Sequence, residues 1–319
     1  MFKNNMIVVV LLLILESVWG SIEFNHANAN ANECDDLVSS LPPRTSPAIV
    51  MQVVNKKYIE YQTNFINVME MNSQFTKDNL FLMCLDDESF STFTSFGINC
   101  VNLENITEGL SNEGEKRHKI WETRVEYVSC LVRAGHDVIM SDSDALWLRD
   151  PMEIFDSHMD SSIIASRGIF PPRAKREWGT AMCMGFIFFR STGTVMNTFQ
   201  KLMKHFVDEF HDDQIALNEA ALEMGVVWNK GSDMKYEGST GFATGIIDLK
   251  NNTSLVSSFI EKDDDLSETM EVTLIPHDIA TRWCIGVPIS EKTVIAHCGW
   301  RGQDKSADMW MKEANVWFP

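Results

Sequence analysis

Residues 137–151, Asp-Val-Ile-Met-Ser-Asp-Ser-Asp-Ala-Leu-Trp-Leu-Arg-Asp-Pro, decide the expected fold. The apolar run at 138–140 is flanked by polar residues, which is typical of a short buried strand. Asp142 and Asp144 follow it, so we expect both carboxylates at the carboxyl end of a sheet, where open α/β sheets bind ligands. Carboxylates there can hold a divalent cation, and the cation holds a phosphate. The segment therefore predicts a metal-dependent enzyme acting on a nucleotide-linked substrate.

Strand-like and helix-like segments alternate on both sides of this motif. Apolar runs predict strands at 48–54, 80–85, 98–101, 137–140, 185–189 and 293–296. Helical spacing of apolar residues predicts helices at 58–71, from 86 onward, at 119–134, 195–210 and 215–224. This alternation predicts an α/β fold with a Rossmann-like mixed sheet, mostly parallel and flanked by helices.

The composition limits the classes of function. The chain has 319 residues, and 45% of them are apolar, which is enough for one large domain or two small ones. The formal net charge is −18. The chain therefore lacks a basic face for a nucleic-acid backbone, so we exclude DNA and RNA as partners. The same charge disfavours an anionic membrane surface, but placed cations and metal ions can still neutralise a nucleotide locally.

The N-terminus is typical of a secretory signal. Lys3 precedes an apolar core at 6–15, and small residues follow that core. We therefore expect a signal peptide at 1–20, cleaved after Gly20. A short signal-anchor is the alternative, in which residues 18–19 extend the apolar run toward the roughly 20 residues of a membrane span.

The rest of the chain divides into a spacer and a domain. Residues 21–46 are rich in Asn, Ala and Pro and lack an apolar period, which predicts a flexible spacer. Residues 47–319 form the single expected catalytic domain. The N-terminus predicts entry into the secretory pathway, with the Golgi lumen as the expected location and secretion as the alternative. N-glycosylation sequons beginning at Asn105, Asn251 and Asn252 agree with a glycoprotein on this route.

The cysteines predict few disulfides. Seven are spread along the chain, at positions 34, 84, 100, 130, 183, 284 and 298. This number is small for a disulfide scaffold, and no C-x-x-C pair indicates a zinc site. We expect one or two bridges and a free thiol, with the pairing left open.

Four segments, in order, resemble the nucleotide-diphospho-sugar transferases of glycosyltransferase family 77. The first is 137–151, in which Asp-x-Asp, an aromatic residue and Arg-Asp-Pro follow an apolar strand. The second is Gly-Phe-Ile-Phe-Phe-Arg-Ser-Thr at 185–192, and the third is Asp213-Gln214 with Asn218. The fourth is 297–305, which begins with His297 and ends with Lys305. The resemblance covers about 46–319.

This resemblance implies a GT-A fold and transfer of a sugar from a UDP-sugar donor with retention at the anomeric carbon. It implies that Asp142, Asp144 and His297 hold Mn²⁺ or Mg²⁺, with Asp142 acting directly or through water and the donor ribose. Two hard oxygen ligands and one imidazole suit manganese well. The donor-binding residues implied, besides the two aspartates, are Gly185, Gly302 and Lys305.

The resemblance also implies a carboxylate or amide oxygen near the reacting carbon. Asp213 and Gln214 are the catalytic candidates, because an oxocarbenium-like transition state needs such an oxygen on its face. The two mechanisms left open are a covalent nucleophile and electrostatic support for front-face attack. An alternative role for Asp212 or Asp213 is that of an N-cap, since both precede a helix.

Two positions depart from the family pattern. Cys183 stands where the family usually has Asn, and a thiol cannot replace the amide hydrogen bonds. Arg124 stands where the family commonly has Lys, which keeps the charge but changes its geometry.

Two other classes of function fit part of the pattern. Phosphohydrolases of the haloacid dehalogenase type also place Asp-x-Asp after a strand, but they begin the domain with it and have Thr or Val where Leu146 stands. A catalytically degenerate transferase that acts as a glycan-binding or assembly partner is favoured by Cys183. The main expectation is a transferase using a galactose, xylose or arabinose donor and a glycan or glycoprotein acceptor.

Overall fold

The computed structural model describes residues 34, 37–39, 41, 48–251, 253–260, 267–282, 289–297, 309, 311–312 and 315–318. The expected signal peptide at 1–20 and most of the expected spacer lie outside these residues. Most of the sequence segment that ends in Lys305, including Gly302, also lies outside them.

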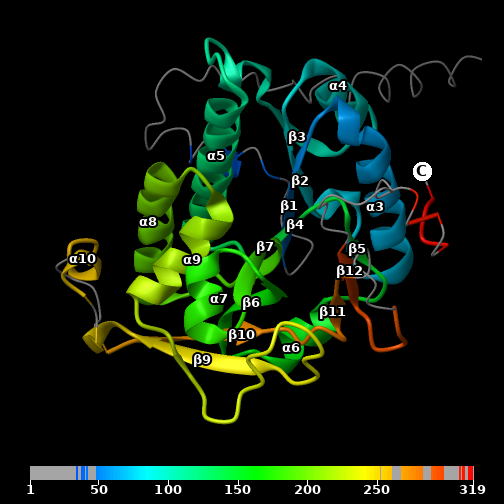
Figure 1. Cartoon of the computed structure of the whole chain (residues 1–319). Helices are drawn as coiled ribbons and strands as arrows, with labels where there is room; N and C mark the ends of the chain where they lie inside the picture. Colours follow the sequence, from blue (N-terminus) through cyan, green and yellow to red (C-terminus); the bar gives the residue numbers. More distant parts are fainter. Residues whose placement is uncertain are drawn as a thin grey trace, which may run out of the picture.

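A nine-stranded mixed sheet forms the centre of the molecule (Figure 1). Its order is β3-β2-β1-β4-β7-β6-β10-β9-β8. The strands are β1 (Ile49–Val54), β2 (Leu80–Cys84), β3 (Asn99–Asn102), β4 (Val138–Ser141), β6 (Ser161–Gly168), β7 (Ala181–Phe189), β8 (Val227–Trp228), β9 (Ala243–Asp248) and β10 (Thr269–Leu274). The first four in this order are parallel, and β7 and β9 run against the other strands. The expected α/β fold with a mixed, mostly parallel sheet is confirmed.

Helices cover both faces of this sheet (Figure 1). They are α3 (Ile59–Asn72), α4 (Asp87–Ser95), α5 (Glu113–Arg133), α6 (Met152–Ser157), α7 (Pro172–Trp178), α8 (Gly193–Phe210), α9 (Asp213–Glu223) and α10 (Ser254–Ser257). Short 3-10 turns are η1 (Lys56–Tyr58), η2 (Lys77–Asn79), η3 (Glu104–Thr107) and η4 (Leu249–Asn251). In the part of the chain that the structure describes, no helix has the length and apolarity needed to cross a bilayer.

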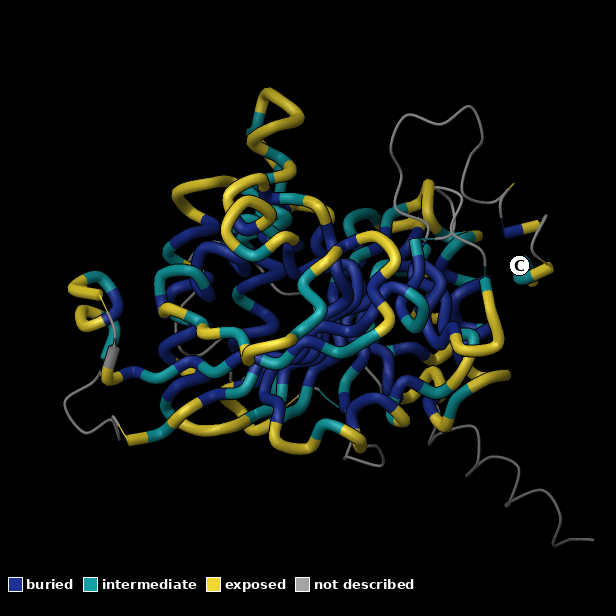
Figure 2. The backbone as a smooth tube through the Cα atoms, turned by 60° about the horizontal axis from the view of Figure 1, so that its bottom comes forward, coloured by how far each residue is buried: buried dark blue, intermediate teal, exposed yellow. Residues whose placement is uncertain are grey.

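Alternation along the strands divides the core into two layers. Successive strand residues point to opposite faces, so Phe81 packs with Val128 of α5 in one apolar cluster, and Leu82 packs with Phe65 of α3 in the other. The buried residues accordingly fill the interior while exposed ones occupy peripheral loops and helix ends (Figure 2). The sheet is thus fixed from both sides, and its carboxyl edge is a rigid base for a site.

A second, three-stranded sheet lies beside α3, with the order β11-β12-β5. Its strands are β5 (Ala145–Trp147), β11 (Ala280–Thr281) and β12 (Ile295–His297). Trp147 anchors it to the core, since its ring meets Phe65 and Phe75 edge-on at centroid distances of 5.5 and 5.2 Å. This sheet joins the segment after the Asp-x-Asp motif to residues about 150 positions later in the chain.

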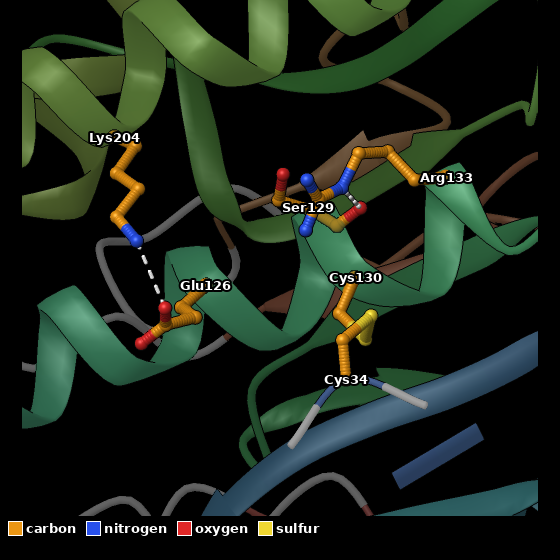
Figure 3. Close-up of a disulfide and its surroundings, with 6 residues drawn as sticks. All are labelled: Cys34, Glu126, Ser129, Cys130, Arg133 and Lys204. Carbon is orange, nitrogen blue, oxygen red and sulfur yellow. Dashed lines mark hydrogen bonds and ion pairs between the residues drawn. A yellow bond between two sulfur atoms is a disulfide. The ribbon is translucent and has the colours of Figure 1, made fainter. Parts of the chain in front are cut away.

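A disulfide fixes part of the expected spacer to the domain. Cys34 is bonded to Cys130 of α5, with 5.5 Å between their Cα atoms (Figure 3). Leu37 is 2% exposed and belongs to the core cluster that contains α5. The expected flexibility of 21–46 therefore does not extend to this short stretch. Among the described cysteines, Cys84, Cys100 and Cys183 are free.

Removal of this bridge should destabilise the protein. The bridge closes a loop with a sequence separation of 96, so Cys34→Ser should lower the free energy of unfolding by about 2–5 kcal/mol. Urea denaturation of wild type and variant, with and without dithiothreitol, measures the effect. The reductant should lower the wild-type midpoint and leave the variant unchanged, whereas equal midpoints of the two oxidised proteins would contradict the prediction.

Candidate active site

The Asp-x-Asp motif forms a turn at the end of β4. Asp142 follows β4 directly, and its backbone N–H donates to the carbonyl of Gly185 on β7 at 2.8 Å. The N–H of Ala145 donates back to the Asp142 carbonyl at 2.9 Å, which closes the turn. Asp144 precedes β5. Both carboxylates therefore lie at the carboxyl end of β4, as the sequence predicted.

The small sheet brings His297 to these carboxylates. β12 runs antiparallel to β5 with His297 opposite Ala145, so the imidazole lies next to Asp144. Its Nε2 is 3.3 Å from Asp144 Oδ1 and 3.6 Å from Asp142 Oδ2. One ligand atom from each of the three residues lies within 4.8 Å of the others. The three side chains that the resemblance implied as metal ligands thus converge.

The electrostatics of this group favour a bound cation. Burial of the His297 ring and the nearby Arg282 both lower its pKa, but the charge and hydrogen bond of Asp144 and the hydrogen bond of Cys183 together outweigh them, and the result is a pKa of about 9. The carboxylates thus attract positive charge strongly enough to hold a proton on a buried ring. A metal ion would compete with that proton for the imidazole nitrogen. Two carboxylate oxygens and one imidazole nitrogen are also a donor set that fits Mn²⁺ or Mg²⁺.

Gly185 leaves the space that the imidazole occupies. A Cβ at this position would lie 2.5 Å from Asp142 Oδ2 and still closer to the His297 ring. Any side chain here would displace the ring or the carboxylate. The absence of a side chain at Gly185 of β7 therefore allows His297 of the small sheet to lie against the large one. Gly185 also lines the neighbouring cavity.

Arg124 joins the Asp-x-Asp turn to α9. This α5 residue is 5% exposed, and its Nη2 donates to Asp142 Oδ1 at 3.2 Å and to the Met184 carbonyl at 3.1 Å. Its Nη1 pairs with Asp213 Oδ2 at 3.1 Å. Burial lowers the pKa of Arg124, but Asp213 and Asp142 together raise it above its usual value, so the guanidinium stays charged. Its planar fork serves two carboxylates at once, which a lysine ammonium does with less defined geometry.

At the start of α9, one of the two aspartates caps the helix and the other, the catalytic candidate, does not. Asp212 is the N-cap, because its side chain accepts the N–H of Ile215 at 2.8 Å. Asp213 is 5% exposed and faces Arg124 instead. Burial raises the pKa of Asp213 to about 6, against the opposing effect of Arg124.

Gln214 and Asn218 attach α9 to β7. The amide oxygen of Gln214 accepts the N–H of Met184 at 3.2 Å, and its nitrogen donates to the Phe170 carbonyl at 2.6 Å. Asn218 pairs with both the N–H and the carbonyl of Met182 at 2.9 Å. The Asp-Gln-x-x-x-Asn segment thus provides hydrogen-bond partners for backbone groups of β7 in the part of that strand that does not pair with β4.

A cavity of about 600 Å³ opens over these groups, within the usual range for small-molecule sites. Asp142, Asp144, His297 and Gln214 line it, whereas Asp213 is not among its lining residues. It also contains side chains not predicted as site residues from the sequence, namely Asn55, Tyr58, Arg117, Trp121, Tyr236 and Arg282. Asn55 follows β1 directly, so the strand-end rule that identified Asp142 could have identified Asn55 too.

Arg282 contacts the cysteine that departs from the family pattern. Its Nη2 donates to Cys183 Sγ at 2.6 Å. Burial raises the pKa of Cys183, but Arg282 and then His297 lower it, giving a value of about 7. This pairing could not be predicted from the sequence, because no strand was expected near 280 and the two residues are far apart in the chain.

Asp213 gives a testable dependence of stability on pH. Its folded pKa of about 6 exceeds the unfolded value of about 3.9, so protonation favours the folded state. This contribution, about 3 kcal/mol, is present below about pH 4 and is lost as the pH rises through about 6. In metal-free urea titrations, the free energy of unfolding of wild type relative to Asp213→Asn should fall over that range. A relative stability that rises with pH would contradict the prediction.

The fold and the site together define an α/β protein with an acidic, histidine-containing ligand set at the carboxyl edge of its sheet. Residues 76–288, more than half of the chain, match the nucleotide-diphospho-sugar transferase family. The chain belongs to this family, which places it among the glycosyltransferases.

Individual relatives are distant. An uncharacterized protein of Arabidopsis thaliana is 20% identical over 222 residues, which span 63% of this chain and 65% of the relative. The beta-arabinofuranosyltransferase RAY1 of Arabidopsis thaliana is 23% identical over 174 residues, 53% of this chain and 32% of that protein. The matched part therefore covers less than two thirds of either relative. The apo structure of the bifunctional glycosyltransferase WbbM is similar with a TM-score of 0.41 and 14% identity, over 56% of this chain and 38% of that one.

Proposed function

We propose that this protein is a metal-dependent, retaining glycosyltransferase that moves a sugar from a UDP-sugar to a glycan or glycoprotein acceptor. The observation that carries the proposal is the convergence of Asp142, Asp144 and His297 within 4.8 Å at a cavity of nucleotide-sugar size. Family membership supports the nucleotide-diphospho-sugar as donor.

Asp142, Asp144 and His297 would hold the Mn²⁺ or Mg²⁺ ion. When bound, the ion stabilises the departing diphosphate as a Lewis acid. Arg124 holds the Asp142 carboxylate in place through its contact at 3.2 Å. Gly185 keeps the space for the His297 ring open. These residues thus preserve the geometry of the ligand set before the donor arrives.

Gln214 and Asp213 have different positions relative to the cavity. Gln214 lines it, with its amide oriented by Met184 and Phe170. Asp213 lies against Arg124 and does not line the cavity. We infer that Gln214 is the nearer of the two to the reacting carbon, and that Asp213 acts electrostatically through Arg124. Front-face attack with electrostatic support is therefore favoured over a covalent Asp213 intermediate.

The cavity also offers surfaces for the nucleoside and the sugar. Tyr58 is 48% exposed at its edge, and Trp121 lies on the α5 side. Aromatic rings of this kind stack on bases and on the apolar faces of sugars. The matching arabinofuranosyltransferase favours arabinose within the expected galactose, xylose and arabinose classes. The Cys34–Cys130 bridge supports folding in the secretory pathway and the expected location in the Golgi lumen.

The test is turnover of nucleotide sugars by the purified protein. UDP-arabinose, UDP-xylose and UDP-galactose are each incubated with Mn²⁺ or with EDTA, and released UDP is measured. GDP-mannose is the donor control. We expect release from at least one UDP-sugar with Mn²⁺ and none with EDTA. Absence of turnover with every donor, combined with binding of glycans, would instead support a non-catalytic glycan-binding partner.

A further inference from the structure

Arg282 lies next to the ligand set because of strand pairing. β11 runs parallel to β12, with Thr281 opposite Ala296. Arg282 follows β11 directly and His297 is the last residue of β12, so the two residues are neighbours at the same end of the small sheet. Both side chains line the cavity. A cation is thus placed beside the position proposed for the metal.

The hydrogen-bonding capacity of Arg282 differs from that of Arg124. Arg124 uses its guanidinium on Asp142, Asp213 and a backbone carbonyl. Arg282 donates a hydrogen bond to Cys183 Sγ at 2.6 Å, whereas Asp144 and Asp142 act on it through charge. A guanidinium has five N–H donors, so this single weak acceptor leaves donors for a ligand in the cavity.

The charges of the cavity call for a further cation when a donor binds. A divalent ion balances the two carboxylates of Asp142 and Asp144, and the diphosphate then adds negative charge of its own. Arg124 is already paired with carboxylates, and Arg117 donates to the Glu113 carbonyl on its own helix at 3.4 Å. Arg282 is the cavity arginine that lies beside the ligand set and has a thiol as its described partner.

We propose that Arg282 binds the diphosphate of the nucleotide donor and that Cys183 holds its guanidinium in place. The small, buried Cys183 side chain leaves room for the guanidinium and fixes it by an N–H···S contact. When the bond between the anomeric carbon and the diphosphate oxygen breaks, its electron pair remains on that oxygen, while the acceptor hydroxyl oxygen bonds to the anomeric carbon and its proton passes to the departing diphosphate. Arg282 then stabilises the added negative charge from a fixed position. This inference rests on the proposed function, because it assumes a nucleoside diphosphate in the cavity.

The experiment compares a ligand that has phosphates with one that lacks them. Affinities for UDP and for uridine are measured by titration calorimetry with Mn²⁺ present, for wild type, Arg282→Gln, Arg282→Lys and Cys183→Ala. Arg282→Gln should weaken UDP binding roughly tenfold or more, the usual effect of losing a charged hydrogen bond, and leave uridine binding within about twofold. Arg282→Lys should weaken UDP binding less, because the charge is retained. Cys183→Ala should also weaken UDP binding less than Arg282→Gln does, because the guanidinium remains.

Arg149→Gln is the matched control. Arg149 is an exposed arginine outside the cavity that pairs with Glu153, so its variant should bind both ligands as wild type does. Thermal denaturation of each variant checks its folding. Should Arg282→Gln not fold, Arg282→Lys makes the comparison, with UDP weakened several-fold and uridine unchanged.

Two results would overturn the inference. Equal loss of UDP and uridine binding would mean that Arg282 only maintains the shape of the cavity, and unchanged UDP binding would mean that it makes no phosphate contact. Failure of wild type to bind UDP with Mn²⁺ would instead contradict the proposed function itself. The wild-type titration therefore separates the two failures.

Discussion

Replacement of Asp144 by asparagine should lower metal-dependent turnover of a nucleotide sugar roughly 1000-fold. A metal acting as Lewis acid supplies several kcal/mol to the transition state, and each 1.36 kcal/mol is a factor of ten in rate. The amide keeps the size of the carboxylate but removes the charge that faces His297 at 3.3 Å. UDP release at saturating Mn²⁺ and donor measures the effect.

The control for this prediction is Asp160→Asn, because Asp160 is an exposed aspartate that does not line the cavity. It should retain wild-type turnover and wild-type melting temperature. A further check is the dependence on Mn²⁺ concentration, which should shift upward in Asp144→Asn. Full activity of Asp144→Asn with EDTA present would rule out the proposed metal site.

Replacement of Arg124 by methionine should lower the free energy of unfolding by about 3–5 kcal/mol, the usual cost of removing one partner from a buried ion pair. The change leaves Asp142 and Asp213 without the cation that lies 3.2 and 3.1 Å from them. It also leaves the Met184 carbonyl without its donor. Urea denaturation at pH 7 measures the loss.

A second substitution tests this explanation. Adding Asp213→Asn to Arg124→Met removes one of the two stranded charges, so the double variant should recover part of the lost stability. Arg149→Gln is the surface control, since its exposed pair with Glu153 should contribute less than about 1 kcal/mol. Strict additivity of the Arg124 and Asp213 effects would contradict a direct interaction between them.

The sequence predicted the first half of the sheet better than the second. β1, β2 and β4 are mostly apolar, which is typical of parallel strands buried on both faces. β6, with the sequence Ser-Ser-Ile-Ile-Ala-Ser-Arg-Gly, is buried along its whole length but has no apolar pattern to reveal it. β9 and β10 were missed for a similar reason, because glycine, threonine and glutamate interrupt them.

The site was predictable where its residues follow recognisable strands. Asp142 and Asp144 were found from the strand that precedes them. His297 was placed with them by the resemblance, because no local pattern predicts that a strand near 295 pairs with one near 145. Arg282 was missed entirely, since its position depends on that long-range pairing and on the neighbouring two-residue strand β11.

The division of the ligand set between two sheets has a consequence for assembly of the protein. Asp142 follows a strand of the large sheet, whereas His297 belongs to the small one. A cation bound by both side chains would link the two sheets. Binding of the ion and packing of β12 in the small sheet would therefore be coupled. We expect Mn²⁺ to protect β11 and β12 against hydrogen exchange more than it protects the strands at the far edge of the large sheet.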